Sequence, residues 1–294
     1  MFNIYNRKQK EEVNVNNKQV FSRGIRSVRD VVYQQQSPTH KVGLVIEPGN
    51  WQDADPFLLM AEDFFVLGTF GMHPHRGIET VTYVIDGKLE HFDNKTGGGE
   101  LHPGDVQWMT AGKGIIHTED PAVGETVQSL QLWVNLPSDK KMSEPRYQNM
   151  RAQDMPVRYE DGATIRVFSG SSQGVTADTK NHVPVSMVEL IVEPGTTVTQ
   201  DLPGSYNGFL YIIEGTGTFG SEGAEGKKGQ VLWLDRGTDG EKTEVKIHAE
   251  EKLHIMLYAG QPVGEKVVAR GPFVMNSEEE IVQAYKDYRD GRFE

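Results

Sequence analysis

Short β-rich runs separated by turn residues recur along nearly the whole chain, and this pattern constrains the fold more than any other feature. Each run is bounded by Gly, Pro, Asp or Asn, which favour turns. Examples are FFVLGTF (64–70), TVTYVI (80–85), DVQWM (105–109), SLQLWV (129–134), VSMVELIV (185–192), FLYII (209–213), QVLWL (230–234) and LHIMLYA (253–259). Closely spaced short strands of this kind are typical of β-sandwiches and β-barrels, so we predict an all-β fold with antiparallel strands.

One segment near the C-terminus departs from this pattern. Residues 277–289, SEEEIVQAYKDYR, begin with a capping box formed by Ser277 and Glu280 and carry apolar residues at helical spacing. Gly291 follows as a plausible helix stop. We therefore predict a C-terminal amphipathic helix that packs against the β structure.

The two halves of the chain form a weak internal repeat. TYVIDGKLEH (82–91) resembles LYIIEGTGTF (210–219), and PGDVQWM (103–109) resembles KGQVLWL (228–234). Repeats of this kind indicate two copies of one supersecondary unit, here a β-barrel. The sequence between the halves is polar and rich in proline, which favours a linker. We therefore divide the chain into an N-terminal barrel (1–140), a linker (141–160) and a C-terminal barrel with the helix (161–294).

Composition excludes several classes of protein. The chain has 42 acidic and 30 basic residues, so a surface of net charge -12 disfavours direct binding to nucleic acid or to an anionic membrane. It has no cysteine, which excludes disulfides, zinc–thiolate sites and cysteine nucleophiles. The N-terminal residues lack an apolar signal core, and no apolar run is long enough for a transmembrane helix. We expect a cytoplasmic protein.

Two short motifs in the first half carry the strongest chemical signal. His73-Pro74-His75 and His117-Thr118-Glu119 each place two metal-ligand side chains two residues apart, on one face of an extended strand. A single His-x-His is weak evidence, because histidine pairs are common on surfaces. Two such pairs between strand-like runs favour one metal site more strongly.

The repeat supports a site in the first barrel only. When the turn glycines of the two halves are aligned, the four candidate ligands fall on residues that cannot rebuild the histidine cluster. The correspondences are His73 with Asp201, His75 with Pro203, His117 with Lys242 and Glu119 with Glu244.

The remaining polar candidates are weaker. A straight strand would carry Glu79 about 13 Å beyond His75, so we expect a polar group near the rim or behind the ligands. His91 could line the cavity, although a surface position is favoured. Other histidines are interpreted as loop or solvated side chains, namely His102, His40, His182 and His248, and His254 is interpreted as a hydrogen-bonded core residue.

Three imidazoles and one carboxylate suit Fe(II), and also Mn, Co, Ni, Cu or Zn. Four protein ligands on an octahedral ion would leave two positions for a substrate and dioxygen, whereas a closed four-ligand zinc site would be structural. Aromatic and thioether side chains near the motifs could form an apolar pocket for a flat ligand, and Phe70, Met72 and Trp108 are the candidates. In most β proteins such residues are simply core.

Several longer segments together resemble the pirin family of the cupin superfamily. They are DPFLLMAEDFF (55–65), GMHPHRGIETVTYVIDG (71–87), PGDVQWMTAGKGIIHTEDP (103–121), LQLWVNLP (130–137) and GPFVMNSEEEIVQAYKDYRDGRF (271–293). The resemblance implies two cupin barrels, with one metal, usually iron, in the first. It places the ligands at His73, His75, His117 and Glu119, and implies that Glu79 is not a ligand. General cupin motifs have proline at the position of Thr110, and this departure from the general motif resembles the pirin pattern.

The resemblance leaves three functions open. Some pirins are similar to quercetinases, which use dioxygen to open the central ring of flavonols and release carbon monoxide. In that case Glu119 is the base for the substrate hydroxyl. Other pirins resemble redox-sensing regulators that use an iron site to present a surface to a protein partner. A structural bicupin with adventitious metal is the third alternative.

Overall fold

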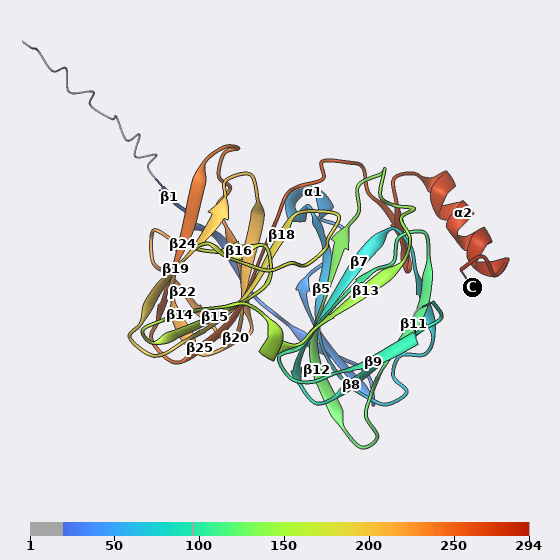
Figure 1. The fold of residues 1–294 in the computed structure, drawn as a ribbon, viewed down its shortest axis with the longest axis horizontal. Helices are drawn as coiled ribbons and strands as arrows, with labels where there is room; N and C mark the ends of the chain where they lie inside the picture. The colour runs from blue at the N-terminus through green and yellow to red at the C-terminus, as the bar shows by residue number, and fades with distance from the viewer. Residues whose placement is uncertain (1–19, 96, 294) are drawn as a thin grey trace, which may run out of the picture.

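The computed structural model describes residues 20–95 and 97–293. Two β-barrels lie side by side, and the single long helix lies at the far edge of one of them (Figure 1). The prediction of a mostly β fold with two barrels and a C-terminal helix is confirmed. The prediction that the N-terminal residues lack a signal core concerns residues outside the described ranges.

The first barrel consists of a seven-stranded and a four-stranded sheet. In spatial order the larger sheet is β13 (Arg146–Met150), β10 (Val106–Thr110), β7 (Ile78–Asp86), β12 (Thr126–Asn135), β5 (Phe57–Val66), β4 (His40–Ile46) and β3 (Tyr33–Ser37). The smaller sheet is β6 (His73–His75), β11 (Ile115–Pro121), β8 (Leu89–Asp93) and β9 (Gly97–Leu101). All pairings within these two sheets are antiparallel.

The second barrel repeats this plan. Its larger sheet is β14 (Val157–Glu160), β15 (Ala163–Ser169), β18 (Val185–Val192), β25 (Leu253–Gly260), β20 (Asn207–Glu214), β23 (Gln230–Leu234) and β2 (Ile25–Asp30). Its smaller sheet is β1 (Phe21–Ser22), β24 (Lys242–Ala249), β21 (Thr216–Phe219) and β22 (Ala224–Lys227), with β19 (Thr197–Pro203) also on β24. The short elements are α1 (Trp51–Ala54), a 3₁₀ turn (Ala152–Asp154), β16 (Ser171–Ser172), β17 (Val175–Thr176), β26 (Val268–Arg270) and β27 (Phe273–Met275).

Strand pairing exchanges chain segments between the two halves. β1 and β2 come from the N-terminal half, but they pair with β24 and β23 of the second barrel. The segment predicted as a linker supplies an edge strand to each barrel, because β13 pairs with β10 and β14 pairs with β15. The C-terminal segment returns to the first barrel, where Phe273 bridges to Arg76. Exchanged edge strands cover sheet edges that would otherwise expose unpaired backbone groups.

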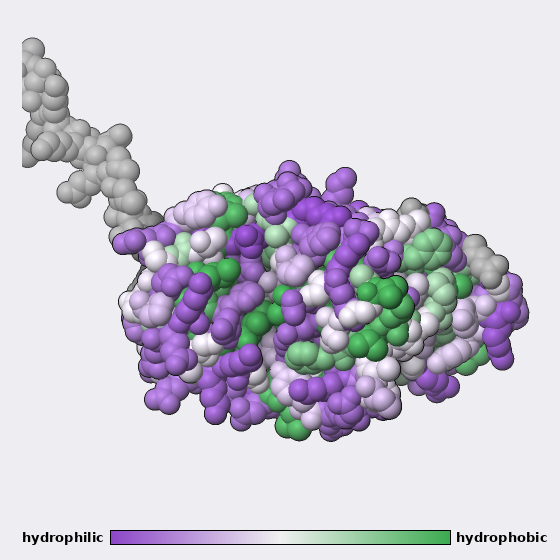
Figure 2. All heavy atoms as spheres, turned by 90° about the horizontal axis from the view of Figure 1, so that it is seen from below, coloured by the Kyte–Doolittle hydropathy of each residue, from purple (hydrophilic) through white to green (hydrophobic). Residues whose placement is uncertain are grey.

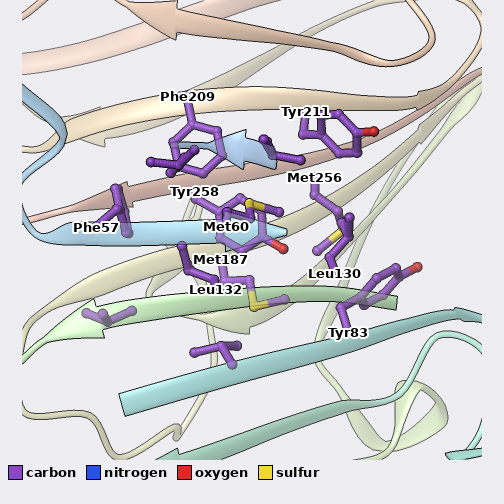
Figure 3. Packing of buried hydrophobic residues seen from close by; sticks show 14 of the residues in the cluster. Phe57, Met60, Tyr83, Leu130, Leu132, Met187, Phe209, Tyr211, Met256 and Tyr258 are labelled. Atoms are coloured by element: carbon purple, nitrogen blue, oxygen red, sulfur yellow. The ribbon is translucent and has the colours of Figure 1, made fainter. Parts of the chain in front are cut away.

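The two large sheets pack face to face over a shared hydrophobic core (Figure 3). Because the two halves are an internal repeat, the same kind of contact occurs twice across this interface. The Tyr83 hydroxyl of the first barrel donates to Glu189 of the second at 2.6 Å. In the reciprocal arrangement, Tyr211 of the second barrel donates to Glu62 of the first. Tyrosines and glutamates at corresponding strand positions therefore satisfy each other's polar groups within a buried interface.

Helix α2 (Glu278–Arg289) forms as the sequence predicts, with Ser277 as N-cap and Glu280 completing the capping box. Within the described part of the chain no helix is long and apolar enough to cross a membrane. The face shown in Figure 2 is mostly hydrophilic, with separate hydrophobic patches, the most compact over the half formed by the first barrel.

The C-terminal residues after α2 close over the first barrel. Phe293 is 1% exposed, and its ring lies under the guanidinium carbon of Arg76 at 4.4 Å. Its backbone oxygen accepts a hydrogen bond from Asn94 at 2.8 Å. A Cβ on Gly114 would lie 2.8 Å from the Phe293 ring, so only glycine allows this close approach. The aromatic ring thus fixes the turn that leads into β11.

Replacing Phe293 with alanine is expected to lower the free energy of unfolding by about 3–5 kcal/mol, because it leaves a cavity under Arg76. Urea unfolding followed by circular dichroism measures this loss. Val282→Ala, at a 60% exposed position on α2, is the matched control and should change stability by less than about 0.5 kcal/mol. Equal effects of the two substitutions would contradict the anchoring role of Phe293.

Candidate metal centre

Strand register brings the two histidine motifs together. β6 pairs antiparallel with β11, so that His117 lies opposite His73 and Ile115 lies opposite His75. Alternation on β11 turns His117 and Glu119 to the same, buried face. The potential ligand nitrogens of His73, His75 and His117 all lie within 4.8 Å of one another. The structure therefore brings the three predicted histidines into one cluster.

The donor set fits a metal ion. Both ring nitrogens of His75 and of His117 are buried and have no hydrogen-bond partner among the described residues. Unpartnered buried nitrogens are costly unless a ligand binds to them. The backbone oxygen of Gly71 lies 2.8 Å from Nδ1 of His73, which fixes that ring and leaves Nε2 available.

The protonation state of the cluster also suits metal binding. Burial and then the charge of His73 lower the pKa of His75 to about 3. Burial, followed by the neighbouring histidines His75 and His73, lowers the pKa of His117 well below its ordinary value. Both imidazoles are therefore neutral at neutral pH, which is the form that binds a metal.

Glu119 lies beside the histidines and is held by two hydrogen bonds. Thr82 Oγ1 donates to Oε1 at 2.9 Å, and Gln131 Nε2 donates to Oε2 at 2.6 Å. Its carboxylate groups with His91 and His117, within 4.8 Å, rather than with all three predicted histidines. Its role as fourth ligand therefore stays a prediction.

His91 is a polar neighbour of the cluster that the sequence interpretation placed on the surface. It is 2% exposed, its ring centroid lies 5.3 Å from that of His117, and Nε2 lies 3.4 Å from Asp93 Oδ2. Because β8 pairs with β11 so that His91 lies opposite Glu119, alternation turns both side chains inward. The His91-Phe92-Asp93 spacing, which repeats the offset of two seen in the ligand motifs, was the available signal.

The cavity next to the cluster has a volume of about 400 Å³. Its polar lining residues are Asp63, Thr69, His73, His75, Thr82, Glu119, Ser129 and Gln131, and its other lining residues are Phe65, Phe70, Gly71, Leu89, Trp133 and Pro272. Trp133 stands edge-on to His75, with ring centroids 5.1 Å apart. Two histidines of the cluster thus line a pocket that has both polar and aromatic side chains in its walls.

Phe70 lines this cavity, as predicted, but the other two predicted pocket residues do not. Met72 is 49% exposed, on the turn before β6. Trp108 is fully buried in the core shared by the barrels. The reason is register, because Trp108 pairs with Val81, whose side chain lies on the opposite face of β7 from Thr82.

Glu79 also lies outside the cavity. It is fully buried and accepts a hydrogen bond from Thr110 at 2.7 Å. Burial raises the pKa of its carboxyl group, and the hydrogen bond from Thr110 opposes this shift. The turn between β6 and β7 breaks the strand alternation that the sequence argument assumed, so Glu79 does not share the face of His75. Of the two positions expected for Glu79, the rim is wrong because the side chain is fully buried, and the described hydrogen bond to Thr110 does not connect it to the candidate ligands.

Two further histidines form hydrogen-bonded pairs. His254 lies 2.9 Å from Glu189, which fits the predicted core role. His40 was interpreted as solvated, but its side chain is only 15% exposed and Nε2 lies 2.7 Å from Asp63 Oδ1. The polar sequence neighbours of His40 gave no sign of this pair, which depends on β4 lying beside β5.

A buried lysine donates hydrogen bonds that stabilise the turn after His75. Lys141, 1% exposed, donates to the backbone oxygen of Gly77 at 2.9 Å and to Asn135 Oδ1 at 2.7 Å. Gly77 has a φ of +80°, and a Cβ there would lie 1.9 Å from the backbone oxygen of Val274. The end of β6 is therefore fixed by packing as well as by hydrogen bonds.

Burial lowers the pKa of Lys141 from 10.5 to about 7. Between pH 7 and pH 9 the unfolded chain therefore keeps a proton that the folded chain releases. The free energy of unfolding is expected to rise over this range, by at most about 1.4 kcal/mol per pH unit. Urea unfolding at the two pH values measures the difference, and the range ends at 9 because exposed tyrosines ionise near pH 10.

Lys141→Met should remove this contribution to the pH dependence, whereas Lys140→Met, at a 46% exposed side chain, should retain it. If the wild type and Lys141→Met gained the same stability from pH 7 to pH 9, the assignment of this titration to Lys141 would be wrong.

Fold and site together define a bicupin, a protein of two cupin barrels, with a candidate metal centre in the first. The model of the pirin family matches residues 45–134, and that of the pirin C-terminal cupin domain matches residues 187–294. A pirin-like protein from Solanum lycopersicum is 42% identical over 244 residues, which cover 82% of each chain. The chain belongs to the pirin family.

Solved structures agree with this assignment. The crystal structure of GK1651 from Geobacillus kaustophilus is 66% identical, with a TM-score of 0.84 over 85% of this chain and 100% of that one. A quercetin 2,3-dioxygenase from Acinetobacter baumannii is 29% identical, with a TM-score of 0.82 over 92% and 98% of the two chains. The nickel(II) complex of the bacterial pirin YhhW from Escherichia coli, 20% identical with a TM-score of 0.63 over 80% and 98%, shows the shared fold.

Proposed function

We propose that this protein is a metal-dependent dioxygenase that opens the central ring of flavonols such as quercetin. The metal is most simply Fe(II), held by His73, His75, His117 and Glu119. The observation that carries the proposal is the cavity of about 400 Å³, which is lined by His73, the unpartnered His75, the Glu119 carboxylate and aromatic side chains. The similarity to a quercetin 2,3-dioxygenase over almost the entire chain supports it.

The bound metal would act as a Lewis acid that polarises the 3-hydroxyl and 4-carbonyl oxygens of the flavonol. Glu119 accepts the proton of the 3-hydroxyl, and the hydrogen bonds from Thr82 and Gln131 hold its carboxylate in place for that transfer. Phe70 and Trp133 provide flat apolar walls that stack on the rings and exclude water. Dioxygen is the second substrate, and the products are a ring-opened ester and carbon monoxide.

The test is aerobic turnover of quercetin by purified protein of known metal content. Loss of the flavonol absorbance together with carbon monoxide release, in proportion to bound metal, supports the proposal. Stoichiometric iron without turnover would overturn it. If partner binding then changed with the oxidation state of the iron, that result would favour a redox-sensing regulator. A protein without stoichiometric metal would be a structural bicupin.

A further inference from the structure

A second polar group lines the same cavity and belongs to neither group of candidate ligands. Asp63, on β5, lines the cavity, and its carboxylate Oδ1 is bonded to His40 Nε2 at 2.7 Å. The side chains are 11% and 15% exposed, so most of this pair is shielded from bulk water. The proposed role of the cavity does not use it.

One side of the Asp63 carboxylate is free for a ligand. Among the described residues its hydrogen-bond partner is His40, on Oδ1, which leaves Oδ2 available. Ser129, directly opposite Asp63 on β12, also lines the cavity and has no side-chain hydrogen bond within the described ranges. Phe70 stacks edge-on against the His40 ring at 5.0 Å and fixes the imidazole that orients the carboxylate.

Strand register gives the separation of this pair from the proposed metal end. Gln131, which holds Glu119, lies opposite Ala61, two residues along β5 from Asp63. Two residues along a strand span roughly 7 Å and one strand across adds roughly 5 Å, so the Cα atoms of Gln131 and Asp63 lie about 9 Å apart. A flat two- or three-ring molecule can span a separation of this order.

The chemistry of the pair selects the kind of group that it binds. A shielded carboxylate with a free oxygen accepts a hydrogen bond from a donor, and the neighbouring Ser129 hydroxyl can accept or donate a second. Aromatic residues around the pair favour a donor carried on a flat ring. A phenolic hydroxyl meets both requirements, whereas an anionic group would be repelled by the carboxylate.

We propose that Asp63, positioned by His40, is a second anchor that binds a hydroxyl of the aromatic substrate remote from the metal-binding end. This inference rests on the proposed function and deepens it, because it assigns the substrate class as polyhydroxylated flavonols. Flavonols that carry the 3-hydroxyl and 4-carbonyl alone lack the group that Asp63 recognises. Asp63 therefore determines specificity between flavonols.

The test compares quercetin with 3-hydroxyflavone, which keeps the metal-binding oxygens and lacks all other hydroxyls. In metal-loaded protein, Asp63→Ala and Asp63→Asn should raise KM for quercetin by about 10-fold or more, since a hydrogen bond to a charged group contributes roughly 1.5–3 kcal/mol. The kcat for quercetin and both constants for 3-hydroxyflavone should change little. Glu90→Gln, a carboxylate at a 53% exposed position on β8, is the matched control.

Binding separates this inference from the proposed function. Quenching of tryptophan fluorescence gives the Kd of each flavonol without any turnover, because Trp133 lines the cavity. If the protein turns over neither flavonol, the proposed function fails, but a selective loss of quercetin affinity in Asp63→Ala still supports the anchor. An equal loss for both flavonols, no loss for quercetin, or no binding of quercetin to the wild type would each overturn the anchor.

Discussion

Replacing His117 with alanine is expected to weaken metal binding by more than about 100-fold, because loss of a group that merely supports a ligand already costs about 10–100-fold. His117 is the central candidate, since it belongs to both groups of closely spaced ligand atoms, one with His73 and His75 and one with His91 and Glu119. Elemental analysis after anaerobic loading with Fe(II), followed by desalting, measures the bound metal. Turnover of quercetin should fall in parallel.

His102→Ala is the matched control for this experiment. The His102 side chain is 56% exposed, in the same barrel but outside the cluster. The control should retain the metal content and the thermal unfolding curve of the wild type. If His117→Ala kept stoichiometric iron while remaining folded, the metal centre would have to lie elsewhere, and the proposed function would lose its basis.

Replacing Glu119 with glutamine is expected to lower kcat for quercetin by about 10²–10⁴-fold, the usual contribution of a positioned base. The fold should persist, because an amide of the same shape can accept from Gln131 and donate to Thr82, the two groups that now contact the carboxylate. The three histidines should still retain iron. The measurement is therefore kcat per bound iron rather than kcat per protein.

The Glu119→Gln result separates two roles of the carboxylate. A variant that keeps its iron and loses turnover supports Glu119 as the base. A variant with unchanged kcat per iron would exclude that role. Glu90→Gln controls for the loss of one negative charge on the same sheet, because β8 pairs directly with β11.

The sequence predicted several of the core strands and the C-terminal helix, because their signals are local. Alternating apolar runs between turn residues indicated the strands, and the Ser277–Glu280 capping box located the helix start at the residue where the structure has it. His73, His75 and His117 could be recognised for a similar reason. Two residues that lie two positions apart on one extended strand share a face of that strand, independently of the tertiary fold.

Contacts between residues on different strands could not be predicted from these local signals, because they depend on which strands become neighbours. His40 looked solvated by its sequence neighbours, and it meets Asp63 only because β4 lies beside β5. His91 looked like a surface residue, and the pairing of β8 with β11 turns it toward His117. Trp108 was assigned to the pocket, but its register with β7 places it in the core between the barrels.

By itself, then, the sequence determined the β architecture, its duplication and the two motifs that carry the candidate ligands, since these follow from local periodicity and from the internal repeat. The pairing of β6 with β11 is what brings His73, His75 and His117 into one cluster. Tertiary structure alone decided that β1 and β2 complete the second barrel, that Phe293 returns to close the first, and that Asp63, paired with His40, lines the cavity. These features depend on long-range pairing, in which residues far apart in the chain bury surface and satisfy polar groups together.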